Sequence, residues 1–424
     1  MRYIIQILGK LKGYVEVTYT INGFSHVARL SSEALSEYYK GDCRIILLAP
    51  ESLVTHLTND IDEAKGLLRD KLWFTEFTKQ RVENNQLLNK PFQVKHMQSS
   101  GFYNHSSAYA LKFNNTLDNI VSDQLIQLAL IEDADELVLD VSTGYNTQVL
   151  ALQEAVRVLT VYHKLKRLLQ DGGGLKVKIS SISPVRSQGE YPVDLYDFDA
   201  KAFFEFPIKG REAPKVADLV IDASDEFKRK LSMSFNWSKI SKAVGEARRA
   251  YNAIKYNAPL TLFYDEIIGK EEDSKECLKT LFDIANYIEE QRSIEVDKNM
   301  ILSKRIRISR RTLVNLMLTL ALHTTLAEFR RGLKGSEPTP SNLHDIFVDL
   351  YEKIGLQLNA RFLQRDLSDY VDRSGGAIRS DVKRNFFAHS GLLEDYVEGA
   401  MGKKLAYKSE CVDEVKEWLE KSEN

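Results

Sequence analysis

Apolar and polar residues follow one another in two different ways along this chain of 424 residues. Up to about residue 185, short apolar runs typical of buried strands alternate with stretches in which apolar residues recur at helical spacing. The expected strands cover residues 3–8, 14–20, 24–30, 44–49, 92–97, 136–141 and 176–182. The expected helices begin at residue 31, extend from about residue 51 to 80, and cover 117–131 and 147–169. Strands that alternate with helices predict a mostly parallel sheet with covered faces.

The pair Asn22-Gly23 separates the second and third expected strands. This pair favours the type I′ turn of a two-residue hairpin, because both residues tolerate a positive φ. The sequence therefore predicts that these two strands pair directly with each other.

A purely helical pattern begins at about residue 215. The expected helices cover 216–234, 236–256, 273–291, 309–333, 342–356, 358–371, 379–389 and 409–422. The proline-containing stretch 186–214 predicts a linker, in which residues 202–206 could form a hairpin. The sequence thus predicts an α/β Rossmann-like domain over residues 1–185, followed by this linker and an all-α helical domain over residues 215–424.

Composition narrows the class of protein. A hydrophobic content of 43% and a charged content of 28% are ordinary for a globular protein, and the formal net charge is −2. Any contact with RNA must therefore come from a local patch. Cys43, Cys277 and Cys411 form no paired motif, which disfavours a zinc site or a disulfide framework and favours a reducing cytoplasm. The most apolar stretch, residues 313–329, is interrupted by polar residues and predicts a core helix, not a membrane span.

Residues 384–389, Arg-Asn-Phe-Phe-Ala-His, combine an arginine, an amide and a histidine. Arg384 keeps its charge and offers a planar fork of donors that suits a phosphate. His389 can take up and release a proton near neutral pH. RNA cleavage by the ribose 2′-hydroxyl needs proton transfer and a cation beside the phosphate, and it needs no metal ion. On spacing alone, the alternative is a structural histidine among aromatic side chains.

Three loops that follow expected strands carry groups suited to an anionic ligand, since ligands of an open parallel sheet bind at the carboxyl ends of its strands. These groups belong to Gly9, Lys10, Ser52, Ser142, Thr143, Gly144 and Asn146. The last four precede an expected helix, whose N-terminus would favour an anion. Alternatively, Ser142 and Thr143 only cap that helix and Gly144 only makes the turn. The chain has no G-x-G-x-x-G after a strand and no P-loop, which disfavours a nicotinamide or flavin enzyme and an NTPase.

Taken together, the two motif regions resemble the CARF–HEPN ribonucleases that accompany type III CRISPR systems. Arg384 and His389 match the catalytic pair of the family's R-N-x-x-A-H motif, and Asn385 matches its amide. The family's ligand-binding loop is matched by Ser142, Thr143, Gly144 and Asn146. The first loop departs from the family pattern, because Leu8-Gly9-Lys10 stands where a Trp-Gly-Asn-like stretch is frequent.

The resemblance implies a cytoplasmic homodimer that could assemble further. Its first domain would bind a cyclic oligoadenylate, with cyclic tetra-adenylate as the first expectation, and this ligand would be an allosteric activator and not a cofactor. Binding would switch on metal-independent cleavage of single-stranded RNA in antiviral defence. No metal site, DNA partner or membrane is expected.

Helix geometry favours an active site shared by two chains. On an ideal helix Arg384 lies about 140° around the axis from His389, so one copy of the motif makes a poor catalytic cluster. Two copies across a two-fold axis could supply an arginine and two histidines. The 2′-oxygen would attack the adjacent phosphorus and leave a 2′,3′-cyclic phosphate and a 5′-hydroxyl. His389 would act as base or acid, Arg384 would stabilise the developing charge, and Asn385 would orient the substrate or the histidine.

Other functions fit the same residues. The protein could be a non-catalytic cyclic-nucleotide sensor whose helical domain binds RNA or a protein partner, or its first domain could slowly degrade the activator with help from Ser142 or Thr143. The run from Lys304 to Arg311 holds five cations in eight residues. It is either a groove for an RNA backbone or a solvated charge run.

Overall fold

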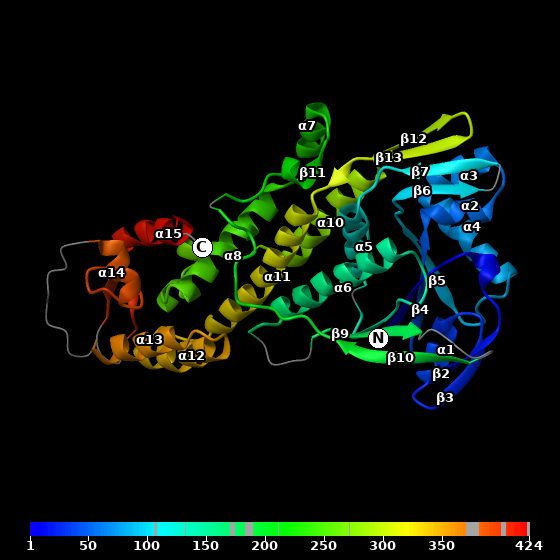
Figure 1. Cartoon of the computed structure of the whole chain (residues 1–424). Helices are drawn as coiled ribbons and strands as arrows, with labels where there is room; N and C mark the ends of the chain where they lie inside the picture. The colour runs from blue at the N-terminus through cyan, green and yellow to red at the C-terminus, as the bar shows by residue number, and fades with distance from the viewer. Residues whose placement is uncertain are drawn as a thin grey trace.

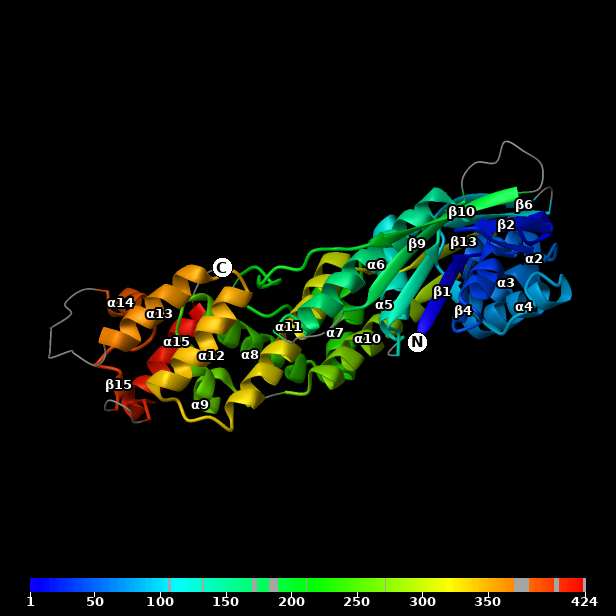
Figure 2. The same ribbon diagram turned by 90° about the horizontal axis from the view of Figure 1, so that it is seen from below.

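The computed structural model describes residues 1–105, 108–131, 133–169, 174–182, 190–210, 212–270, 272–369, 381–399 and 404–421. The molecule is elongated, with the strand-rich N-terminal half at one end and the last helices of the chain at the other (Figure 1). The view from below shows the same elongation (Figure 2).

An eight-stranded sheet in the order β3-β2-β10-β9-β8-β1-β4-β5 forms the base of the N-terminal half. Its strands are β1 (Arg2–Ile7), β2 (Val17–Ile21), β3 (Phe24–Ala28), β4 (Arg44–Pro50), β5 (Phe92–Met97), β8 (Glu136–Asp140), β9 (Lys176–Ile182) and β10 (Glu190–Phe198). The neighbouring strands β5, β4, β1, β8 and β9 run parallel, so the expected parallel sheet is confirmed. The direction of winding reverses between β1 and β8, which is where ligands bind in such sheets.

Side chains of the central strands alternate between two hydrophobic cores, because successive residues of a strand point to opposite faces. Ile5 and Ile7 of β1 pack with α5 and α6, whereas Ile4 and the following Leu8 pack with α1, α3 and α4. These helices are α1 (Ser31–Tyr38), α3 (Ile61–Arg69), α4 (Lys71–Asn84), α5 (Leu117–Ala129) and α6 (Asn146–Lys166). Burial on both faces explains why the central strands are continuous apolar runs in the sequence.

The expected hairpin is confirmed, and the expected long helix after it is wrong. Asn22 and Gly23 have φ of 47° and 81° and join the antiparallel strands β2 and β3. The stretch after β4 is divided into the 3-10 turn η2 (Glu51–Leu53), α2 (Val54–Leu57), α3 and α4. Asp60 and Asp70 each accept hydrogen bonds from the first backbone N–H groups of the next helix, and these caps start new helices.

The expected linker 186–214 contains a strand of the main sheet. β10 pairs antiparallel with β9, so this part of the chain belongs to the N-terminal half. The hairpin expected at residues 202–206 is wrong, since no strand occurs in that range. Phe204 and Phe206 instead pack against Tyr251, with ring centroids 4.9 Å and 5.5 Å away. The alternating aromatic residues there serve packing and not strand pairing.

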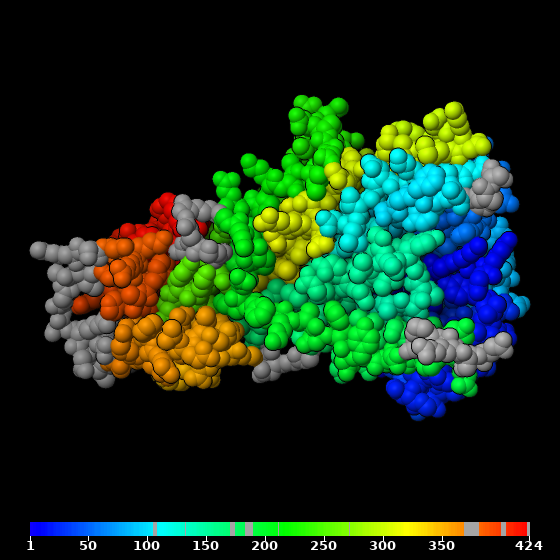
Figure 3. All heavy atoms as spheres, viewed as in Figure 1, coloured from blue at the N-terminus to red at the C-terminus, as the bar shows by residue number. Residues whose placement is uncertain are grey.

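The expectation of an entirely helical second half is also corrected. A hairpin of β12 (Arg292–Asp297) and β13 (Met300–Arg305) joins β7 (Tyr109–Phe113) and β6 (Gly101–His105) in a second sheet, ordered β12-β13-β7-β6. β13 pairs in parallel with β7, so residues from the second half complete a sheet of the first. The two segments lie against each other on the surface of the molecule (Figure 3). Strands β6 and β7 were not predicted from the sequence. They pair with each other, but the other neighbour of β7, β13, lies almost two hundred residues further on.

The helical half surrounds one long central helix, α11 (Arg310–Leu333), which packs against α6, α8 and α10. Its other helices are α7 (Asp225–Ser234), α8 (Ser238–Lys255), α9 (Asp265–Ile268), α10 (Ser274–Glu290), α12 (Pro340–Lys353), α13 (Gln357–Asp369), α14 (Val382–Ala388) and α15 (Val412–Lys421). Short strands β11 (Val220–Ile221) and β14 (Arg307–Ile308) pair before α11 begins. Among the described residues, α11 alone has the length and composition of a membrane span, and 61% of its most apolar window is buried inside the protein.

Candidate functional site

A cavity of about 240 Å³ lies at the carboxyl ends of β1 and β4, beside the start of α6. It is lined by Leu8, Gly9, Lys10, Pro50, Ser52, Leu53, His56, Gly144 and Tyr145. Four of the predicted ligand-binding residues thus come together from three loops: Gly9, Lys10, Ser52 and Gly144. The cavity occupies the place where the winding of the sheet reverses, as the sequence predicted for a ligand site.

The other three predicted residues are not among those that line the cavity. The Thr143 hydroxyl donates to the Ile7 carbonyl oxygen and so ties the loop between β8 and α6 to β1. The Ser142 N–H donates to Asp140 Oδ1 at 2.9 Å. Asn146 is exposed at the first position of α6. Ser142 and Thr143 therefore stabilise the loop between β8 and α6 through hydrogen bonds within the protein.

Backbone geometry explains the two glycines of the cavity. Gly144 has a φ of 100°, and a Cβ there would lie 2.8 Å from Cγ2 of Ile7. The N–H of Gly9 donates to the Tyr14 hydroxyl at 2.7 Å. Burial raises the pKa of Tyr14, so its hydroxyl stays protonated. Both loops are held close to the first strand, which keeps the cavity open between them.

A buried polar network beneath the cavity was not predicted from the sequence. The Gln6 amide donates to Ser31 Oγ at 3.1 Å and to Thr143 Oγ1 at 3.4 Å. The Ser31 hydroxyl donates in turn to the Asp140 carboxylate. Burial raises the pKa of Asp140, and hydrogen bonds from Ser142 and Ser31 oppose that rise. A single glutamine within an apolar strand has no sequence signature, so only the fold reveals that Gln6 supports the site.

Two lining residues missed in the sequence add an aromatic ring and an imidazole. Tyr145 is 54% exposed, and its ring centroid lies 5.5 Å from that of Tyr103 on β6. His56 comes from α2 and had no motif around it. Tyr145 could have been predicted, because it directly follows Gly144 in the sequence. Nothing in the sequence pointed to His56.

The predicted catalytic stretch forms the short helix α14 and the turn that follows it. Asp381 caps the helix by accepting a hydrogen bond from the Arg384 N–H at 3.2 Å. The helix ends at Ala388, and the His389 N–H donates to the Asn385 carbonyl oxygen at 3.0 Å. Asn385 and His389 are thus brought together by the last helical turn. Arg384 is exposed.

The turn after His389 requires glycine. Ser390 and Gly391 have φ of 55° and 69°, so the chain makes two consecutive left-handed steps. A Cβ on Gly391 would lie 3.1 Å from the Ala258 Cα and 3.0 Å from the Tyr407 hydroxyl oxygen. The Tyr407 hydroxyl donates to the Gly391 carbonyl oxygen at 3.0 Å. This packing fixes the position at which His389 leaves the helix.

A buried carboxylate lies behind His389. Oδ1 of Asp366, on α13, is 3.8 Å from Nδ1 of His389; the Asp366 side chain is 1% exposed and that of His389 is 32% exposed. Asp366 also accepts hydrogen bonds from the Ser390 hydroxyl at 2.6 Å and from the Arg365 guanidinium at 2.8 Å. The sequence did not single out Asp366, because it precedes His389 by 23 residues without any shared motif.

The basic run is largely neutralised within the chain. Lys304 pairs with Glu295 at 3.0 Å, and Arg310 lies 3.0 Å from both Asp118 and Glu154. Arg305 and Arg307 form ion pairs with Glu51 and Asp222, whereas Arg311 is exposed. Neither an open RNA groove nor a simple solvated charge run describes these residues, because most of them bind acidic side chains of other elements.

Strand β4 and helix α2, whose residues line the cavity, lie toward one end of the molecule, and α14 lies toward the other (Figure 1). A larger cavity of about 630 Å³ lies in the helical half, next to Arg330 and Asp265, and is lined by none of the predicted site residues. Within the described ranges, no three His, Cys, Asp or Glu side chains converge as metal ligands would.

A doubly wound sheet with a ligand cavity at its reversal point defines a Rossmann-like ligand-binding domain. Residues 3–181 match the family model described as CRISPR system endoribonuclease Csx1, CARF domain. The match supports a CARF-containing, CRISPR-associated protein similar to Csx1, and a CARF domain implies sensing of cyclic oligoadenylates in type III CRISPR defence. The helical half lies outside the matched residues. A comparison of the chain with curated proteins found no significant match.

Proposed function

We propose that this protein is a cytoplasmic endoribonuclease that a cyclic oligoadenylate activates and that cleaves single-stranded RNA without a metal ion. The surroundings of His389 carry the proposal: a partly exposed imidazole stands 3.8 Å from the buried Asp366 carboxylate. An exposed arginine, Arg384, precedes it on the same helix. The CARF match supports the activating half of the proposal.

The proposed reaction is an internal attack by the RNA. His389 takes the proton of a ribose 2′-hydroxyl, and the 2′-oxygen bonds to the adjacent phosphorus. The bond from phosphorus to the 5′-oxygen breaks, and that oxygen takes up a proton. The products end in a 2′,3′-cyclic phosphate and a 5′-hydroxyl. Arg384 stabilises the negative charge that grows on the phosphoryl oxygens.

Asp366 acts in this proposal as a positioning residue. A carboxylate beside Nδ1 favours the tautomer that carries a proton on Nδ1, which leaves Nε2 to work on the substrate. It also stabilises the imidazolium that forms when His389 takes the proton. Ser390 and Arg365 hold the Asp366 carboxylate in place through their own hydrogen bonds.

Dimerisation completes both sites in the proposal. A cavity of about 240 Å³ is smaller than the usual ligand pocket of about 300–1,000 Å³. One chain would therefore hold part of a cyclic tetra-adenylate and its partner the rest. Lys10 and the N-terminus of α6 would bind phosphates, and the exposed ring of Tyr145 would stack on an adenine. At the other end, the second His389 of the dimer would donate the proton to the leaving 5′-oxygen.

Incubation of the full-length protein with labelled single-stranded RNA tests the proposal. Three reactions are compared: one without ligand, one with cyclic tetra-adenylate and one with cyclic hexa-adenylate. Each is run with and without excess chelator. We expect cleavage with one of the cyclic ligands, cyclic phosphate ends on the products, and no effect of the chelator. Cleavage that stops in chelator and returns with magnesium or manganese would contradict the mechanism. Ligand binding without any cleavage would instead favour a non-catalytic sensor.

A further inference from the structure

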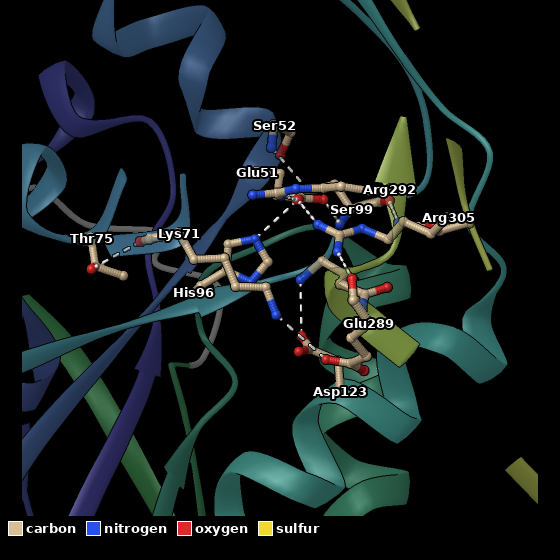
Figure 4. Close-up of polar contacts among 12 residues, drawn as sticks. Glu51, Ser52, Lys71, Thr75, His96, Ser99, Asp123, Glu289, Arg292 and Arg305 are labelled. Carbon is tan, nitrogen blue, oxygen red and sulfur yellow. Dashed lines mark hydrogen bonds and ion pairs between the residues drawn. The ribbon is translucent and has the colours of Figure 1, made fainter. Parts of the chain in front are cut away.

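Glu51 lies at the centre of a buried charged cluster between the two halves of the molecule. Figure 4 shows His96, Arg292 and Arg305 converging on its carboxylate from separate elements. His96 Nε2 lies 2.9 Å and Arg292 Nη1 3.4 Å from Glu51 Oε1, and Arg305 also binds this oxygen. The side chains of Glu51 and Arg305 are each 1% exposed. We call these four residues the Glu51 cluster.

The Glu51 cluster directly adjoins the ligand cavity. Glu51 stands between Pro50 and Ser52, which both line the cavity. Ser99 binds the same turn twice: its N–H donates to Glu51 Oε2 at 3.3 Å, and its hydroxyl accepts from the Ser52 N–H at 3.0 Å. A ligand that moves the turn Glu51–Leu53 must therefore move or break the contacts of the Glu51 carboxylate.

The partners of Glu51 on the far side belong to the helical half. Arg292 and Arg305 face each other at the base of the hairpin of β12 and β13. The Arg305 guanidinium donates to Glu51 and, at 2.7 Å, to the carbonyl oxygen of Glu289 at the end of α10. A cation at a helix C-terminus is electrostatically favourable. Arg305 thus connects the wall of the cavity to one end of a seventeen-residue helix.

The electrostatics of the cluster favour one well-defined arrangement. Burial alone would raise the pKa of Glu51, but Arg305, His96 and Arg292 hold it well below its usual range. Burial lowers the pKa of His96, and its contact with Glu51 opposes that shift. Removing one partner of a buried ion pair leaves an uncompensated charge, which is strongly unfavourable. The turn and α10 are therefore expected to move together and not to separate.

A chain of buried contacts continues from α10 to the candidate active site. At the other end of α10, the Ser274 hydroxyl lies 2.6 Å from Nδ1 of His323, whose Nε2 lies 3.1 Å from Glu246 of α8. Just beyond α8, the Asn257 amide donates to Ser390 Oγ at 2.8 Å. The Ser390 hydroxyl donates to Asp366, which is the carboxylate behind His389.

We propose that the contact between Glu51 and Arg305 transmits ligand binding in the cavity to α10, and that α10 and α8 carry the movement to Ser390 and Asp366. The inference rests on the proposed function for its final effect, the control of His389. Its structural part, a response of α10 to the ligand, is independent of whether RNA is cut.

Amide hydrogen exchange in the full-length protein tests the link, because it reads the helical half directly. In the wild type, cyclic tetra-adenylate should change exchange in the cavity loops, in α10, in α8 and at residues 385–391. Glu51→Gln should still bind cyclic tetra-adenylate in the cavity but lose the changes in α10 and α8. Stimulation of RNA cleavage should then fall about 5- to 100-fold, the usual range of an allosteric coupling.

A matched control and a second variant make the outcome decisive. Lys304→Gln removes an exposed ion pair with Glu295 one residue before Arg305 and should behave as the wild type. The double variant Glu51→Gln, Arg305→Met removes both buried charges together and gives the same readout if the single variant does not fold. The link would be overturned if the ligand still changed hydrogen exchange in α10 of either Glu51 variant. It would also be overturned if the ligand changed hydrogen exchange in the wild type only around the cavity. An α10 response without RNA cleavage would contradict the ribonuclease assignment and support the link.

Discussion

The ligand cavity and the region around His389 differ in how completely one chain builds them. The cavity lies at the ends of rigid parallel strands, and its loops are tied down by buried hydrogen bonds of Thr143 and Gln6. His389 instead follows a seven-residue helix, and the exposed Arg384 has no described ion pair. We infer that the ligand cavity is organised before its ligand arrives, whereas the proposed cleavage site at His389 would depend on a second chain.

Replacing His389 should separate the two ends most completely. His389→Ala should lower RNA cleavage about 10²- to 10⁴-fold, the usual contribution of a general acid or base. Affinity for the activator should stay unchanged, because the cavity is at the other end of the molecule. The cleavage rate at saturating activator and a binding titration measure the two effects. His344→Ala, an exposed histidine on α12, is the control. Normal cleavage by His389→Ala would refute the catalytic assignment.

Neutralising the carboxylate behind His389 should have a smaller effect of the same kind. Asp366→Asn should lower kcat about 10- to 100-fold with little change in KM, since the variant keeps the substrate site but no longer orients the imidazole. Asp349→Asn, exposed on α12, should change neither. A purely structural role would instead lower the melting temperature without a selective loss of kcat.

A methyl group at Gly144 should damage the cavity end alone. Gly144→Ala combines a positive φ with a contact of 2.8 Å to Ile7, and we expect a loss of about 1–3 kcal/mol in stability. More activator should then be needed for half-maximal cleavage, with the same maximal rate. Gly13→Ala is the control, because a Cβ there meets nothing within 4 Å. Denaturant unfolding and an activator titration give the two values. An equal loss of maximal rate would contradict the separation of the two ends.

The last prediction concerns pH and the contact between the halves. Burial and the nearby Asp123 raise the pKa of Glu289 to about 8. Because the folded state holds this proton more tightly than the unfolded state, the contribution of Glu289 to stability is present below about pH 4.5 and is lost as pH rises through about 8. Glu289→Gln should therefore gain stability relative to the wild type over that window, by at most about 1.4 kcal/mol per pH unit. Glu290→Gln, exposed beside it, should show no such slope.

Local signals in the sequence predicted much of the fold. The Asn22-Gly23 turn, the apolar runs of β1 and β4, and the helix α11 each follow from neighbouring residues, and all are confirmed. The hairpin of β12 and β13 and strand β10 were missed. The hairpin joins β7, which lies almost two hundred residues earlier, and β10 joins β2 as well as its neighbour β9, so the sheets that these strands enter are set by distant parts of the chain.

The residues of the candidate site were likewise only partly predictable from the sequence. Gly9, Lys10, Ser52 and Gly144 could be predicted to meet, because loops at the carboxyl ends of parallel strands share one edge. Gln6 and Asp366 could not, since a single polar residue in an apolar run or a helix gains its role only when folding buries it beside its partner. The acidic partners of the basic run could not be predicted for a related reason: they come from β12, η2, α5, α6 and the residue after β11.

The parallel pairing of β13 with β7 has a consequence for the order in which the protein folds. During synthesis the hairpin of β6 and β7 leaves the ribosome almost two hundred residues before its partner. Until then the edge of β7 exposes unpaired backbone groups, which can pair with another chain. An N-terminal fragment that stops at residue 215 would keep this edge permanently open. We expect such a fragment to aggregate, although it contains every strand of the main sheet.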